Sequence, residues 1–272
     1  MTALTAVLGF PVGHSRSPAM HNAAFEALGL EWRYVKLPVP PERFAETVRA
    51  LPASGYRGVN ATIPHKLATL EIADEASPAA RAVGAANTLT FADGHITADN
   101  TDADGLLDAL GEPPRGRALV LGAGGAGRAA AWALKEAGAE VLVWNRTRER
   151  ARELAKELGV ESVENPRDAD LIVNATSVGL DPTTTEEQAL EQLCLAVLGP
   201  RSSGTVIDLV YRADASPPPI TSWATRAGAR VVDGLEVLVR QGARSFALWT
   251  GQEPPLEAMR HAARGADRGA AA

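Results

Sequence analysis

The sequence predicts a two-domain α/β protein whose sheets are mostly parallel. Short apolar runs of strand length alternate with stretches of helical periodicity along nearly the whole chain, which is typical of parallel sheets covered by helices. With 272 residues, the chain is long enough to bury two ordinary cores. We expect a first domain of residues 1–101 and 236–272, and a second domain of residues 102–235 between them.

The first domain is expected to combine parallel strands with a closing hairpin. Ser17 is expected to cap its first helix, with Pro18 at the first helical position. Asp93-Gly94 lies between two apolar runs and is a hairpin signal, so an antiparallel pair is expected there. The apolar patterns place strands at 4–8, 32–37, 58–63, 86–91 and 95–98, and helices at 17–28 and 41–51.

The second domain shows the regular alternation of a doubly wound sheet. A helix is expected from Thr101 to about Leu110, and the proline-containing loop 111–116 resembles a hinge-like connection at which the second domain starts. Strands are expected at 118–121, 141–144, 171–174, 206–209 and 230–232. Two final helices, 234–249 and 255–264, have no strand to follow and are expected to return to the first domain, before an Ala- and Gly-rich tail that is expected to fray.

Three glycines directly after the first strand of the second domain predict a dinucleotide site. Gly122, Gly124 and Gly127 form G-x-G-x-x-G between an apolar run and a helical pattern, as in a Rossmann domain. The first permits a tight turn, the second lets the backbone approach a pyrophosphate at the helix N-terminus, and the third lets helix and strand pack closely.

The turn after the next strand indicates which dinucleotide binds. An NAD enzyme would carry a carboxylate there for the ribose 2′-hydroxyl, whereas this chain reads Asn-Arg-Thr-Arg-Glu-Arg over 145–150. Guanidinium groups attract a 2′-phosphate and a carboxylate would repel it, so the sequence predicts NADP.

Three polar segments of the first domain predict a site for a hydroxylated anion. Ser15 and Ser17 lie at a helix N-terminus, where unpaired amides and the helix dipole favour a carboxylate, although simple N-capping by Ser17 is the alternative. In 58–66, alternation places Asn60 and Thr62 on one strand face, and Lys66 starts a helix whose dipole disfavours its charge, which suits proton transfer, although an exposed surface lysine is the alternative. The third segment combines Asn87 with Asp102, and an ordinary first-turn acid is the alternative for the latter.

Composition and charge disfavour several kinds of partner and site. The net charge is −6 and Lys/Arg runs are absent, which disfavours nucleic acid and anionic membranes as partners. The five histidines lack metal-ligand spacing, so no metal is expected, and Cys194 between two leucines is expected to be a buried, inert thiol. Neither a signal-like start nor a membrane-length apolar run is present, which predicts a cytoplasmic protein.

The chain resembles the shikimate dehydrogenase family in a series of motifs that spans nearly its whole length. In chain order they are S-R-S-P, G-V-N-A-T-I-P-H-K, A-A-N-T, D-N-T-D, G-A-G-G-A-G, N-R-T, N-A-T-S-V-G and D-G-L-E-V-L-V-R-Q-G. The resemblance implies an NADP-dependent enzyme that interconverts 3-dehydroshikimate and shikimate in the route to chorismate and the aromatic amino acids.

The resemblance also implies roles for individual residues. Ser15 and Ser17 would hold the substrate carboxylate, while Lys66 and Asp102 would flank the reacting C3 oxygen as the acid-base pair. The remaining substrate contacts implied are Asn60, Thr62, Asn87, Asp102, Tyr211 and Gln241. The cofactor contacts implied are Gly122, Ala123, Gly124, Gly125, Ala126, Gly127, Asn145, Arg146, Thr147, Arg148, Arg150, Thr176, Leu209 and Gly234, with Leu209 standing where the family has methionine.

Alternative functions stay open at this point. The nearest is a relative that acts mainly on quinate or with relaxed cofactor choice, and a more distant one is another two-domain NADP dehydrogenase, such as one for a folate derivative. A non-catalytic NADPH-sensing module would leave Lys66 and Asp102 without a task. We expect the protein to act on a small molecule as a monomer or homodimer.

Overall fold

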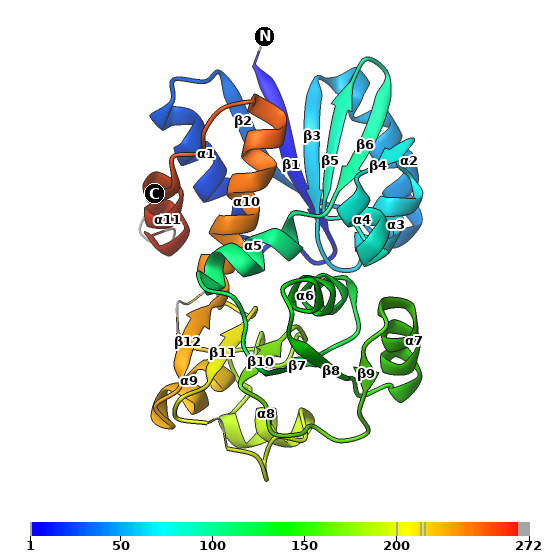
Figure 1. Cartoon of the computed structure of the whole chain (residues 1–272). Coiled ribbons are helices and arrows are strands. Elements are labelled where there is room, and N and C mark those ends of the chain that lie inside the picture. Colours follow the sequence, from blue (N-terminus) through cyan, green and yellow to red (C-terminus); the bar gives the residue numbers. More distant parts are fainter. Residues whose placement is uncertain (1, 200, 213, 215, 266–272) are drawn as a thin grey trace. The chain divides into compact units, whose positions relative to one another are not determined.

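The computed structural model describes residues 2–199, 201–212, 214 and 216–265, and the expected frayed tail beyond Gly265 lies outside them. Two compact units make up the chain. Unit 1 consists of the described residues of Met1–Gly105 and Leu238–Ala272, and unit 2 of those of Leu106–Val237. Each unit has its own six-stranded sheet covered by helices, which confirms the predicted α/β fold class (Figure 1).

Unit 1 is built on a mixed sheet in the strand order β2-β1-β3-β5-β6-β4. Neighbouring strands are parallel except at β5, which runs antiparallel to both β3 and β6. The β5–β6 hairpin turns at Asp93 and Gly94, whose φ angles of 50° and 79° are those that this kind of turn requires, so the predicted hairpin is confirmed. The strands are β1 (Ala3–Gly9), β2 (Trp32–Pro38), β3 (Tyr56–Ala61), β4 (Glu75–Ala76), β5 (Thr88–Ala92) and β6 (His95–Asp99).

Helices cover both faces of this sheet (Figure 1). Alternation along β1 explains why, since Leu8 packs with Phe44 of α2 in one core while Val7 packs with Phe25 of α1 in the other. The second core also contains Trp249 of α10 and Met259 of α11, so the predicted return of the C-terminal helices is confirmed. The helices are α1 (Ser17–Ala27), α2 (Phe44–Ala50), α3 (Lys66–Glu71), α4 (Pro78–Val83), α10 (Gly234–Thr250) and α11 (Leu256–Gly265).

Unit 2 has the strand order of a Rossmann domain. Its six strands are all parallel in the order β12-β11-β10-β7-β8-β9, so the connections reverse direction between β7 and β10. The strands are β7 (Arg117–Leu121), β8 (Glu140–Trp144), β9 (Glu161–Ser162), β10 (Leu171–Asn174), β11 (Thr205–Asp208) and β12 (Arg230–Asp233). The helices are α6 (Gly125–Glu136), α7 (Arg148–Leu158), α8 (Glu186–Gln192) and α9 (Pro219–Arg226). Ligands of such sheets bind beyond the carboxyl ends of the strands at the reversal point.

The chain passes between the units inside helices. The first passage, Gly105 to Leu106, lies within α5 (Thr101–Leu110), and the second, Val237 to Leu238, lies within α10. Leu106 and Leu110 are buried in the core of unit 2, which is why the second half of α5 belongs to that unit. The proline-containing loop 111–116 therefore lies inside unit 2, and the expectation that the second unit starts there is wrong.

Three local expectations differ from the structure. The N-cap of α1 is Arg16, and Ser17 is the first helical residue, whose backbone nitrogen donates to the Oγ of Ser15 at 3.3 Å. The helix expected at 41–51 begins as a 3₁₀ turn, η1 (Pro41–Arg43), before α2. Cys194 is exposed rather than buried, because both flanking leucines enter the core and its own φ of 54° turns its side chain outward.

None of the helices in the described part of the chain combines the length and the apolarity needed to cross a bilayer.

Candidate active site

In unit 1, Lys66 and Asp102 form a close ion pair. Lys66 is the first residue of α3 and Asp102 lies in the first turn of α5, yet Nζ donates to Oδ2 at 2.6 Å. Their side chains are 14% and 18% exposed, so each charge is largely shielded from water and depends on the other. The small exposed part of each side chain leaves the pair within reach of a ligand.

His65 anchors the start of α3 and thereby the position of Lys66. Its ring stacks on Phe44 at 4.3 Å, and its Nε2 lies 2.7 Å from the carbonyl oxygen of Val39. Burial lowers the pKa of His65, and the contact with Val39 opposes that shift. The sequence assigned His65 no role of its own, and its position directly before Lys66 was the one signal for it.

A buried polar network brings together three predicted substrate residues. The Nδ2 of Asn87 donates to the Oε1 of Gln241 at 3.1 Å and to the Oγ1 of Thr101 at 2.9 Å. The Nδ2 of Asn60 donates to the Oγ of Ser245 at 2.8 Å, and its Oδ1 accepts from the hydroxyl of Tyr34 at 2.8 Å. All these amide groups are less than 8% exposed.

The network also includes four residues to which the sequence assigned no individual role. Thr88 is the register partner of Asn60 across β3 and β5, and Ser245 follows Gln241 by one helical turn on α10. Thr101 and Tyr34 complete it. Strand alternation and helical spacing were signals for the first two, but the partner strand and helix are fixed only by the tertiary fold.

The Ser15–Ser17 segment combines hydroxyls, amides and positive charge. Both serines are buried at the start of α1, and Lys36 of β2 donates through Nζ to the carbonyl oxygen of Gly13. The pKa of His14 is lowered by burial and then by the charge of Lys36, and the pKa of Lys36 is lowered by burial and then by Arg16. These effects indicate that the charge of Lys36 lies near His14, and that the charge of Arg16, between the two serines in the chain, lies near Lys36.

Thr62 lies directly beyond β3 and is half-buried. Its backbone nitrogen donates to the carbonyl oxygen of Leu8 at 2.9 Å, and its carbonyl oxygen accepts from the backbone nitrogen of His65 at 2.8 Å. These two bonds fix the turn that leads from β3 into α3.

In unit 2, Gly122 and Gly127 have the backbone roles that their spacing predicts. Gly122 has a φ of 111°, and a Cβ there would lie 2.8 Å from the carbonyl oxygen of Ala175. A Cβ on Gly127 would collide with the carbonyl oxygen of Gly122, so helix α6 can approach the turn only without a side chain. Gly124 is the N-cap of α6, and a Cβ there would meet open space. The start of α6 therefore has open space beside Gly124. The first turn of this helix, which includes Gly125 and Ala126, presents its backbone amides there, and Ala123 lies directly before Gly124.

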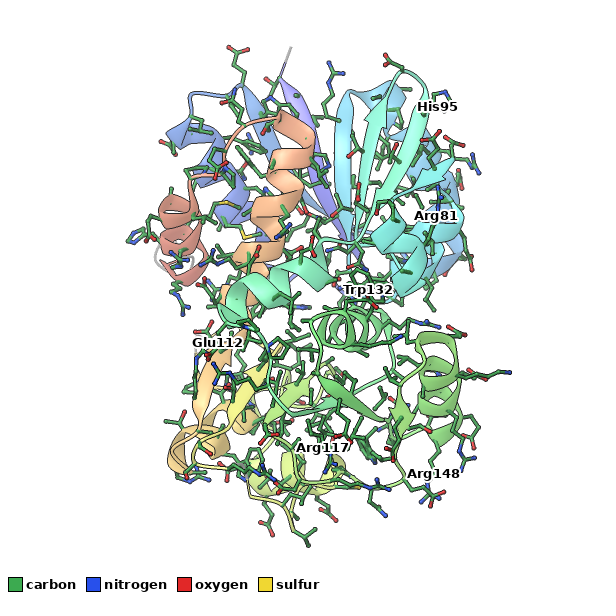
Figure 2. All side chains as sticks on the ribbon, viewed as in Figure 1. Arg81, His95, Glu112, Arg117, Trp132 and Arg148 are labelled. Atoms are coloured by element: carbon green, nitrogen blue, oxygen red, sulfur yellow. The ribbon has the colours of Figure 1, made fainter. Side chains whose placement is uncertain are left out.

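The turn after β8 adds positive charge next to this loop. Asn145 joins the two segments, since its Oδ1 accepts from the nitrogen of Ala123 at 3.2 Å and its Nδ2 donates to the carbonyl oxygen of Thr147 at 2.9 Å. Thr147 is the N-cap of α7 without a side-chain cap bond. Arg146, Arg148 and Arg150 are exposed around this helix start, where Figure 2 labels Arg148, and Arg148 lies 3.6 Å from a carboxylate oxygen of Glu164.

The remaining predicted cofactor residues lie beyond the carboxyl ends of adjacent strands of unit 2. Thr176 follows β10, Leu209 follows β11 and Gly234 follows β12. A Cβ on Gly234 would lie 2.7 Å from the carbonyl oxygen of Leu209, so the last two segments are in close contact. Tyr211 is half-buried two residues beyond Leu209. Within the described residues, no cluster of three His, Cys, Asp or Glu side chains has metal-binding geometry.

The chain matches three sequence families that together span most of its length. Residues 7–89 match the shikimate dehydrogenase substrate binding domain, residues 108–211 match the shikimate / quinate 5-dehydrogenase family, and residues 234–264 match the shikimate 5'-dehydrogenase C-terminal domain.

Individual relatives cover almost the whole chain. A shikimate dehydrogenase (NADP(+)) of Thermus thermophilus is 47% identical over 271 residues, which are 95% of this chain and 97% of the relative. The corresponding protein of Methanothermobacter thermautotrophicus is 41% identical over 278 residues, 96% of this chain and 95% of the relative. Among solved structures, shikimate 5-dehydrogenase of Thermus thermophilus in complex with NADP(H) and shikimate has a TM-score of 0.85 and 44% identity, and the match covers 97% of this chain and 99% of that one.

Proposed function

The chain belongs to the shikimate dehydrogenase family, and from this premise we propose how its own residues perform the NADP-dependent interconversion of 3-dehydroshikimate and shikimate. The observation that carries the proposal is the shielded Lys66–Asp102 pair at 2.6 Å in the unit that also holds the serine pair and the buried amides. We assign unit 1 to the substrate and unit 2 to NADP.

In the proposed site, the substrate carboxylate is held by Ser15 and Ser17. The hydroxyls of the two serines and the cationic side chains of Arg16 and Lys36 favour an anion there. The substrate hydroxyls are bound by Asn60, Thr62, Asn87, Gln241 and, from unit 2, Tyr211. The internal bonds of Asn87 and Gln241 fix the orientation of their amides before any substrate arrives, so little ordering is needed on binding.

The Lys66–Asp102 ion pair carries out the proton transfer. As the C3–OH of shikimate becomes a carbonyl, its oxygen loses a proton, and in the reverse direction the oxygen gains one. Lys66 is the group that exchanges this proton: its ammonium donates the proton in the reduction, and its neutral amine accepts the proton in the oxidation. Asp102 orients the hydroxyl and holds the Lys66 side chain in place.

The residues of unit 2 fit NADP. The pyrophosphate would lie against the open face of Gly124 at the start of α6, and the 2′-phosphate against Arg146, Thr147 and Arg148 at the start of α7. Thr176, Leu209 and Gly234 would line the nicotinamide side. When bound, NADP supplies the hydride acceptor or donor of the reaction.

The finer aspects of its setting are proposals as well. The net charge of −6 disfavours binding to nucleic acid or to an anionic membrane. The protein is expected to act on its small-molecule substrate in the cytoplasm. We expect a monomer or homodimer, which light scattering on a size-exclusion column distinguishes.

The proposal is tested by mixing the protein with shikimate and either NADP⁺ or NAD⁺ and recording the absorbance of reduced nicotinamide. Rapid reduction of NADP⁺, with slower reduction of NAD⁺ and slower turnover of quinate, is expected. Faster turnover of quinate would assign the enzyme to that substrate. Tight NADPH binding with no turnover of either acid would instead identify a sensing module.

A further inference from the structure

Asp208 is a completely buried carboxylate to which the proposed reaction gives no task. It is the last residue of β11, directly before Leu209, and its side chain is 0% exposed. Burial raises the pKa of Asp208 to about 6, against the opposing effect of the hydrogen bonds it accepts. A buried acid is costly to keep, so its presence at the carboxyl end of β11 calls for a physical reason.

The contacts of Asp208 join the ends of two strands. Its Oδ1 accepts from the Nδ2 of Asn174 at 2.9 Å and from the backbone nitrogen of Val210 at 3.2 Å. Its Oδ2 accepts from the Oγ1 of Thr221 on α9 at 3.3 Å. One carboxylate thus ties the end of β10 to the segment after β11 and to the helix that covers them.

Asn174 passes this constraint to the loop beyond β10. With its Nδ2 held by Asp208, its Oδ1 faces Thr176 and accepts from that residue's Oγ1 at 2.7 Å and backbone nitrogen at 3.2 Å. The Oγ1 of Thr176 in turn accepts from the backbone nitrogen of Val178 at 3.1 Å. The orientation of the amide, and with it the path of the loop, depends on which of its two ends meets an acceptor.

The loop after β10, which Asn174 fixes in this way, lies against the glycine-rich turn between β7 and α6. The carbonyl oxygen of Ala175 is the atom that a Cβ on Gly122 would strike first, so the two segments are packed without spare room. Leu209 is joined to the same place, because its nitrogen donates to the carbonyl oxygen of Asn174 at 3.0 Å.

We propose that Asp208 is a positioning residue for the nicotinamide half of the cofactor, which it holds in place through Asn174, Thr176 and Leu209 without touching it. The inference rests on the proposed function, since it takes these loops as the nicotinamide side of the NADP site. The adenosine half lies in this scheme at the starts of α6 and α7, which Asp208 does not contact. Loss of the carboxylate should therefore affect the two halves of the cofactor unequally.

The experiment compares Asp208→Leu and Asp208→Asn with the wild-type enzyme. Leucine has a similar size but no acceptor, so NADPH binding and kcat should fall roughly tenfold to a hundredfold. Binding of adenosine 2′,5′-bisphosphate, which lacks the nicotinamide half, should change less than about twofold. Asparagine keeps an acceptor for Asn174 and should restore most of kcat.

Two further variants keep the test decisive. Asp170→Asn alters a carboxylate at the opposite end of β10, where it accepts from the backbone nitrogen of Arg117, and should leave both ligands unaffected. If Asp208→Leu does not fold by circular dichroism, Asp208→Ser replaces it, because its hydroxyl is too short to reach Asn174, and the same unequal loss is expected.

Three outcomes would overturn the inference: an equal loss of NADPH and adenosine bisphosphate binding, a folded Asp208→Leu that behaves like Asp170→Asn, or an Asp208→Asn enzyme as impaired as Asp208→Leu. The proposed function is judged separately, by whether the wild-type enzyme oxidises shikimate with NADP⁺ at all.

Discussion

At the residue scale, the proposed chemistry depends on two side chains that lie 36 positions apart in the chain and 2.6 Å apart in unit 1. Lys66 is held by the anchored start of α3, and Asp102 by the first turn of α5. Neither charge has much access to water, which makes each one sensitive to loss of the other.

Replacement of this lysine tests its role in proton transfer. We expect Lys66→Ala to lower kcat about a hundredfold or more with a smaller change in KM, because the reacting oxygen loses its proton partner. Steady-state kinetics in both directions measure the effect. Lys156→Ala removes an exposed lysine from α7 and serves as the control. A Lys66→Ala enzyme with wild-type turnover would refute the assignment.

Arg146 is the residue at which cofactor choice can be tested. A carboxylate in its place repels a 2′-phosphate but not a 2′-hydroxyl, so Arg146→Asp should weaken NADP binding far more than NAD binding, by about tenfold or more. The ratio of kcat/KM for the two cofactors is the measurement. Arg115→Asp makes the same charge change on an exposed loop and should leave the ratio unaltered. An unchanged ratio in Arg146→Asp would remove this residue from the phosphate site.

His21 should make folding stability dependent on pH. Its ring is fully buried, stacks on Tyr34 at 4.3 Å, and finds no hydrogen-bond partner for either nitrogen among the described residues. Burial lowers the pKa of His21 to about 3. The unfolded chain, with a pKa near 6.5, therefore binds a proton that the folded protein excludes, so the free energy of unfolding decreases as pH falls from about 6.5 toward 3.

The corresponding test is His21→Phe, which keeps an aromatic ring on Tyr34 and removes the titration. Between pH 7 and pH 5, the wild-type protein should lose about 1 to 2 kcal/mol of stability relative to the variant. Urea unfolding at several pH values measures the difference. His95→Gln, which replaces an exposed histidine, should follow the wild-type curve. Parallel pH curves for His21→Phe and wild type would show that His21 does not exclude a proton.

At the scale of elements, the strand-turn-helix of β7 and α6 shows which features a sequence can specify. The spacing of Gly122, Gly124 and Gly127 predicted three different backbone demands, and the structure shows a positive φ, open space and a close contact at these positions. These demands are local, so the sequence around them is sufficient to predict them.

This difference between glycines leads to opposite expectations for stability and binding. Gly127→Ala should destabilise the protein by about 2 kcal/mol or more, because its Cβ would meet the Gly122 carbonyl. Gly124→Ala should leave the melting temperature within a few degrees, since its Cβ meets open space, but should weaken NADP binding about tenfold or more by occupying the room for the pyrophosphate. Calorimetry with and without NADP⁺ separates the two effects. A Gly124→Ala protein that binds NADP⁺ normally would contradict the assigned cradle.

Other features depend on contacts that no local pattern specifies. Ser17 has the residue type of an N-cap, but the helix already includes Ser17, and the hydroxyl of Ser15 accepts from its backbone nitrogen. Cys194 sits between two core leucines, and only the positive φ of the turn directs it outward. Thr88 and Ser245 join the buried network because β5 and α10 meet Asn60 in space. The individual roles of the substrate residues came from family resemblance, and they stay predictions until mutants are assayed.

At the scale of the whole molecule, the proposed substrate and cofactor residues are largely divided between the two units. The ion pair, the serine pair and the amide network belong to unit 1, and the glycine turn and the arginines belong to unit 2. The sequence showed this two-part organisation through its alternating pattern. It did not show where the chain passes from one unit to the other, because apolar periodicity continues unbroken through both α5 and α10.

This division predicts separate protection of the two units by their ligands. In hydrogen exchange with mass spectrometry, shikimate alone should slow exchange around residues 60–66 and 87–102, and NADPH alone should slow it around 122–127 and 145–150. Peptides of α8 serve as an internal control. Protection of the glycine turn by shikimate alone would contradict the assignment of ligands to units.

The shared helix α5 has a practical consequence for anyone who wishes to transplant the nucleotide-binding half into another protein. A fragment cut at the proline-containing loop would leave Leu106 and Leu110 behind and open a hole in its own interior. A fragment from Leu106 to Val237 keeps both leucines and Val237, which packs in the same core. Its two ends, however, cut through α5 and α10. The boundaries at which this protein can be divided therefore lie inside helices. A fragment design that cuts only in loops would miss them.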